Sequence, residues 1–186
     1  TRCLAIGTKT GSRMAAPSRR YDPFPLFNCG NPASIPLMQF DHIFFRADAS
    51  VGIGAGHVVR CRNVALALRN RFSKNISFIA AEMPTVLRDD LDAIGIDTIL
   101  ISDSHVPEEE RIEKVVSAND RSALVVDSFK SDFYTPTFQR RMVEVFENFV
   151  FIAFDNGPRY YAHVLHNQNP LALKSPFSCE PYTKKL

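Results

Sequence analysis

Residues 44–57 read Phe-Phe-Arg-Ala-Asp-Ala-Ser-Val-Gly-Ile-Gly-Ala-Gly-His. An apolar run ends in a charged turn, and a loop with three glycines then closes on His57. Residues 58–68 read as a helix, so the stretch predicts a strand, a glycine loop and a helix in that order. Glycines let backbone N–H groups approach an anion, a helix N-terminus adds partial positive charge, and a histidine can transfer a proton near neutral pH. This loop therefore combines phosphate-binding geometry with an acid–base group.

The alternation of strand and helix continues along the rest of the chain. Apolar runs predict strands at residues 40–46, 76–81, 97–102, 123–127, 149–155 and 163–165, and helical patterns predict helices at residues 58–68, 84–94, from 107 onward and at 134–146. The strands are apolar throughout rather than alternating, which is typical of a parallel sheet covered on both faces. The sequence thus predicts a doubly wound α/β domain.

In such sheets, ligands bind outside the carboxyl ends of the strands. The polar residues expected at that edge follow four of the predicted strands: Arg46, Asp48, Asp127, Asp155, Asn167 and Asn169. Each also has a structural interpretation, because aspartates often cap turns and the two asparagines precede Pro170 as turn residues do. The convergence of these groups is therefore a hypothesis about the fold.

The glycine loop does not match the common nucleotide-binding motifs. Its pattern, with Gly54 and Gly56 before His57, is not the G-x-G-x-x-G of dinucleotide folds and lacks the Lys-Ser/Thr of a P-loop. A tight turn between a strand and a helix explains the glycines equally well. His57 could cap the helix, and Arg60 could either pair with phosphate or lie on a solvated helix face.

Composition narrows the class of protein. The 186 residues suit one domain, or one domain and a fragment, and the formal charge is +2. Residues 1–37 hold five basic residues against one acid, so the rest of the chain is mildly acidic and shows no nucleic-acid-binding stripe. No apolar run approaches the roughly 20 residues of a membrane span. Four scattered cysteines show no zinc spacing, which favours reduced thiols in the cytoplasm and no metal site.

The motifs resemble one enzyme family in order and spacing. Residues 45–50 and 53–61 look like the N-terminal signature of UDP-2,4-diacetamido-2,4,6-trideoxy-β-L-altropyranose hydrolase, which acts in pseudaminic acid biosynthesis, and of related spore-coat polysaccharide proteins. Residues 125–129 resemble the family's V-V-D-S/H-Y segment, residues 154–156 its I-D-D and residues 167–169 its N-Q-N. The resemblance covers about residues 38–170.

This resemblance implies a Rossmann-like N-terminal catalytic domain of a glycosyltransferase-B type fold. It implies hydrolysis of the bond between a sugar and UDP, with inversion and without a metal or other cofactor. His57 matches the family's essential histidine. The residues expected to bind the UDP-linked amino sugar are those at the strand ends and in the loop: Arg46, Asp48, Gly54, Gly56, Arg60, Asp127, Asp155, Asn167 and Asn169.

The chain also departs from the family. Ser128-Phe129 stands where many members carry His-Tyr, and Asn156 replaces an acid, which puts a role for a second carboxylate in doubt. We expect residues 1–37 to be a disordered or non-native leader, residues 38–170 the domain, and residues 171–186 a truncated linker toward a missing C-terminal nucleotide-binding domain. Two alternatives stay open: a glycosyltransferase half-domain in which His57 deprotonates an acceptor hydroxyl, and a catalytically silent binding fragment.

Overall fold

A single parallel sheet forms the centre of the protein. The computed structural model describes residues 39–69, 71–73, 75–101, 105–116, 121–153 and 160–167. Its six strands are β1 (His42–Arg46), β2 (Ile76–Ala80), β3 (Asp97–Leu100), β4 (Ser122–Asp127), β5 (Asn148–Ala153) and β6 (Val164–Asn167). They lie in the order β3-β2-β1-β4-β5-β6, and each neighbouring pair is parallel. The predicted Rossmann-like doubly wound α/β fold is confirmed.

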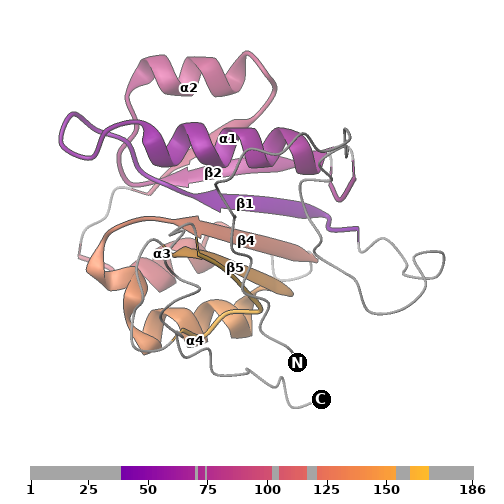
Figure 1. Ribbon diagram of the computed structural model, residues 1–186, viewed down its shortest axis with the longest axis vertical. Helices are drawn as coiled ribbons and strands as arrows, with labels where there is room; N and C mark the ends of the chain where they lie inside the picture. Colours follow the sequence, from indigo (N-terminus) through magenta and orange to yellow (C-terminus); the bar gives the residue numbers. More distant parts are fainter. Residues whose placement is uncertain are drawn as a thin grey trace, which may run out of the picture.

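Helices cover both faces of this sheet. Helices α1 (Gly56–Arg69) and α2 (Thr85–Asp92) lie on one face, and α3 (Glu108–Glu113) and α4 (Pro136–Val145) lie on the other (Figure 1). All four were predicted from the sequence, and each strand lies where an apolar run predicted one. No helix in the described part of the chain is long and apolar enough to cross a membrane.

The fourth helix begins later than the sequence pattern predicted. Residues Ser131–Tyr134 form a short 3₁₀ turn, η1, and α4 starts only at Pro136. Thr135 is extended, as a residue before proline prefers to be, and its Oγ accepts a hydrogen bond from the backbone N–H of Phe138 at 3.2 Å. The Thr-Pro pair is therefore the signal that sets this boundary.

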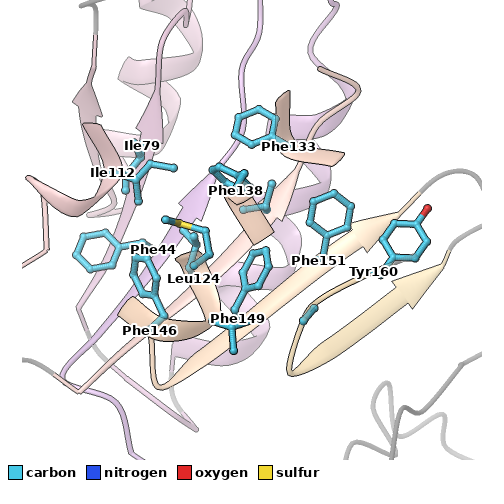
Figure 2. Packing of buried hydrophobic residues seen from close by; sticks show 14 of the residues in the cluster. Phe44, Ile79, Ile112, Leu124, Phe133, Phe138, Phe146, Phe149, Phe151 and Tyr160 are labelled. Atoms are coloured by element: carbon cyan, nitrogen blue, oxygen red, sulfur yellow. The ribbon is translucent and has the colours of Figure 1, made fainter. Parts of the chain in front are cut away.

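Each face of the sheet buries its own hydrophobic layer. On the α3 and α4 face, aromatic rings fill the space between the sheet and α4: Phe149 packs edge-on against Phe138 of α4, and Phe44 packs against Phe146 (Figure 2). On the other face, α1 packs through small residues that include Ala65. Burying one phenylalanine contributes about 1.5–3 kcal/mol. Because both faces are covered, the strands must be apolar on both sides, which is why they read as continuous apolar runs.

Candidate functional site

Several predicted site residues lie at the carboxyl ends of β1 and β4, where the strand order reverses. The chain leaves β1 for α1 on one face, whereas it leaves β4 for η1 and α4 on the other, and β1 and β4 are neighbours. In doubly wound sheets, ligands bind at the carboxyl ends of two such strands, where the connections depart to opposite faces. Of the predicted site residues, Arg46 ends β1 and Asp127 ends β4.

The glycine loop is a closed turn that carries the chain from β1 into α1. The backbone N–H of Gly54 donates to the carbonyl of Ser50 at 2.7 Å, and the N–H of Ile53 donates to the Ser50 hydroxyl at 3.3 Å. Gly54 has a φ of 79°, which side chains other than glycine rarely adopt. Gly56 is then the first residue of α1. The loop thus determines where the helix starts and where His57 lies.

The central contact of the site joins this helix to the end of β4. His57 and Asp127 are 4% and 2% exposed, and His57 Nδ1 lies 2.8 Å from Asp127 Oδ1. An ionised carboxylate only accepts hydrogen bonds, so Nδ1 carries the proton, and in the neutral form of the ring the lone pair is then on Nε2. The described residues give Nε2 no hydrogen-bond partner. A buried carboxylate therefore orients His57 as a potential base.

Two further side chains of α1 contact the same carboxylate. Arg60 donates from Nε to Asp127 Oδ2 at 2.6 Å and from Nη2 to Oδ1 at 2.7 Å, and the Cys61 thiol lies 3.8 Å from Oδ2. Residues at positions i, i+3 and i+4 share one helix face, so helical spacing brings these three groups to one acceptor. Arg60 Nη2 is also 3.1 Å from His57 Nδ1. Both atoms carry hydrogen, so this approach reflects their shared acceptor.

The electrostatics of the cluster agree with this geometry. Burial by itself would raise the pKa of Asp127, but hydrogen bonds from His57 and Arg60 outweigh it and hold that pKa below its ordinary value. The same pairing raises the pKa of Arg60. Burial, reinforced by the Asp127 charge, raises the pKa of Cys61 well above that of a free thiol. Cys61 is consequently a protonated donor and not a nucleophile.

An aromatic side chain borders the site. The ring of Phe129 packs edge-on against His57, with the ring centroids 4.5 Å apart, and Phe129 is 59% exposed. Val51 and Ile53 of the glycine loop are exposed as well. From the sequence, Phe129 was noted only as a departure from the pattern of the resembling family. The contact of Phe129 with His57 could not be predicted, because it depends on the packing of α1 against β4.

A second cluster of charged side chains lies on the α3 and α4 face of the sheet. It contains Arg46 and Asp48, the two predicted site residues at the end of β1. Arg46 is fully buried, with its guanidinium 2.5 Å from both Asp48 and Glu108 and over the ring of Phe133. Lys130 Nζ lies 2.6 Å from Asp48. Arg46 and Asp48 are therefore joined in a buried network that connects β1 to α3 and to the segment after β4, and they do not contact His57.

The remaining predicted residues lie farther along the sheet edge or outside the description. Asn167 is the last residue of β6, in register with Ala153. Asp155 and Asn169 lie outside the described residues. Sequence reasoning did not identify Glu108 or Lys130, because pairs such as Arg46 and Glu108, which are 62 positions apart, leave no local pattern.

No family model matches the chain, and no curated protein or solved structure matches it either. Among the described residues, no three or more His, Cys, Asp or Glu side chains are grouped so that they could hold a metal ion. The chemistry of the site therefore has to be argued from its own groups: an oriented imidazole, a buried carboxylate and an arginine at a sheet edge.

Proposed function

We propose that this domain hydrolyses a UDP-linked diacetamido-trideoxyhexose and releases UDP, with His57 as the catalytic base. The observation that carries the proposal is the hydrogen bond between His57 Nδ1 and Asp127 at the carboxyl ends of the neighbouring strands β1 and β4. Both residues also belong to the motifs through which the sequence resembles the UDP-sugar hydrolase family. Geometry and resemblance thus support the same histidine.

In the proposed reaction, Nε2 of His57 removes a proton from a water molecule that attacks the anomeric carbon. The new C–O bond forms as the bond between the sugar and the diphosphate breaks, and the electron pair leaves with UDP. Attack from the side opposite the leaving group inverts the configuration. Asp127 is a positioning residue: it holds the ring in the Nδ1–H tautomer and stabilises the imidazolium that forms.

Arg60 has two roles in this proposal. Its bidentate pairing with Asp127 offsets the cost of burying that carboxylate. Its side chain is about one-quarter exposed, at 26%, which leaves part of it at the edge of the site beside the leaving diphosphate. A guanidinium near the developing charge would stabilise the transition state.

The proposal is tested by incubating the 186-residue protein with the UDP-linked sugar and measuring UDP release and the anomeric configuration of the free sugar. We expect His57→Gln to slow UDP release by about 100-fold or more, because general base catalysis contributes factors of that size. Asp127→Asn should also lower the rate of UDP release. His42→Gln is the matched control, since His42 is the first residue of β1 and lies at the opposite end of the strands from His57.

Each contrary result has a definite meaning. UDP release that His57→Gln leaves unchanged, or no release by the unaltered protein, contradicts the proposal. Formation of a glycoside that requires an added acceptor identifies a glycosyltransferase instead. Binding of the UDP-sugar without turnover identifies the domain as a binding module.

A further inference from the structure

A second histidine, His166, lies on the same face of the sheet as His57 and also near the carboxyl ends of the strands. His166 is in β6, which is two strands away from β4. The register pairs Asp127 with Ile152 of β5, and Ile152 with His166. These three residues form one row across adjacent parallel strands, and strand spacing puts its two ends about 10 Å apart.

The row points toward α1. Residues that are paired directly in a parallel sheet direct their side chains to the same face, and Ile152 packs in the same layer as Val58 and Cys61 of α1. The alternation along β6 agrees, because Leu165 packs in the layer beneath α4. His166 therefore faces the side of the sheet from which Arg60 reaches Asp127.

The surroundings of His166 favour an uncharged imidazole. Burial lowers its pKa, the positive charge of Arg60 lowers it further, and the carboxylate of Asp127 acts in the opposite sense. Among the described residues, the charged groups that act on it are Arg60 of α1 and Asp127 of β4, and its neighbour in register is the apolar Ile152 of β5. A neutral imidazole next to an arginine can donate an N–H to an anion without the cost of burying a second cation.

We propose that His166, together with Arg60, binds the diphosphate of the substrate, so that the ligand extends from His57 across β5 toward β6. This inference rests on the proposed function. In an inverting displacement, the leaving group lies on the far side of the anomeric carbon from the attacking water. If His57 holds that water over the junction of β1 and β4, the diphosphate lies farther along the edge, where Arg60 and His166 are.

The test compares His166→Gln with the unaltered protein, using UDP, uridine and UDP-N-acetylglucosamine as probes. Imidazole signals are followed by ¹H–¹⁵N NMR during titration, and KM and kcat are measured with the UDP-linked sugar. We expect UDP, but not uridine, to shift the His166 signal. His166→Gln should raise the Kd for UDP and the KM about tenfold, with little change in kcat. His163→Gln, a change at the other end of the same segment, is the control.

The outcomes separate this inference from the proposed function. If UDP shifts the His166 signal and His166→Gln weakens UDP binding while no sugar is released, the inference stands and the hydrolase proposal fails. If the UDP-sugar is hydrolysed and His166→Gln keeps the original KM and Kd, the inference fails alone. If UDP binds without moving the His166 signal, or if neither binding nor turnover is seen, His166 is not a diphosphate ligand.

Discussion

At the scale of single residues, two buried carboxylates organise the carboxyl edge of the sheet. The carboxylate of Asp127 contacts His57, Arg60 and Cys61, which share one face of α1. Asp48 accepts from Arg46 and Lys130, and also from the backbone N–H of Ala81 at 2.8 Å. Removing a carboxylate from water is costly, so each buried aspartate requires several donors. The donors that compensate for burial are also the groups that each aspartate holds in place.

Acid should weaken the protein partly through Asp48. Its pKa is about 2 in the folded state against 3.8 ordinarily, because the hydrogen bonds and charge of Arg46 outweigh the opposing effect of burial. A lowered folded-state pKa means that this stabilisation is fully present above the unfolded pKa and is lost as the pH falls from about 4 through about 2. The size of the shift corresponds to about 2 kcal/mol.

This expectation is checked by measuring the free energy of unfolding in urea between pH 2 and pH 6. Asp48→Asn should be less stable at pH 6 and should show a weaker loss of stability on acidification than the unaltered protein. Asp89→Asn, at an exposed position of α2, is the control. Equal slopes for Asp48→Asn and the unaltered protein would show that Asp48 carries none of the acid sensitivity.

At the scale of elements, glycines with positive φ determine where helices start and stop. Gly54 closes the loop before α1, and Gly95, with a φ of 68°, follows the end of α2. The sequence predicted a helix over residues 84–94, and Gly95 comes directly after it, where glycine is a common helix terminus. Three glycines in one loop, by contrast, did not reveal which of them needs the left-handed conformation.

The glycine loop offers a matched pair of substitutions. Gly54→Ala should lower the free energy of unfolding by about 1 kcal/mol, because an alanine at positive φ is strained even where there is space for its Cβ. Gly52→Ala should change it far less, since Gly52 has equal space and no positive φ. Urea unfolding of both variants measures the difference. Equal effects would mean that the φ of Gly54 does not control the turn.

At the scale of the whole molecule, the two hydrophobic layers share one sheet but differ in character. The α3 and α4 layer is rich in aromatic rings (Figure 2), whereas α1 contributes the smaller side chains of Val58, Cys61 and Ala65 to the other layer. His57 lies on the same face of α1 as Cys61 and Ala65, and from there it reaches Asp127 of β4. Of the eight buried phenylalanines among the described residues, six lie in the layer beneath α3 and α4.

Stability should therefore depend strongly on the aromatic layer. Phe149→Ala removes a fully buried ring between β5 and α4 and should cost about 3–5 kcal/mol. Val86→Ala, at a position of α2 that is 71% exposed, should stay within about 0.5 kcal/mol of the unaltered protein. Chemical denaturation measures both. A loss below about 1 kcal/mol for Phe149→Ala would contradict the assignment of this layer as the main core.

Most of the fold was predictable because its signals are local. A continuous apolar run such as that in residues 123–127 identifies a strand covered on both faces from its own composition, and β4 lies there. The periodic pattern predicts a helix from residue 134, whereas Thr135 caps α4 and delays its start to Pro136. The site was harder: Asp127 was chosen for its place at a strand end, but its contact with His57 joins positions 70 residues apart.

The sequence by itself determined the order of strands and helices, the glycine loop that leads to His57, and the set of polar residues at the strand ends. Only the tertiary structure decided how those residues are divided. It pairs Asp127 with His57 and Arg60 on one face, and it encloses Arg46 and Asp48 with Glu108 on the other. The reason is physical: alternation along a strand and register between strands assign each side chain to a face, and the register depends on the packing of the whole sheet.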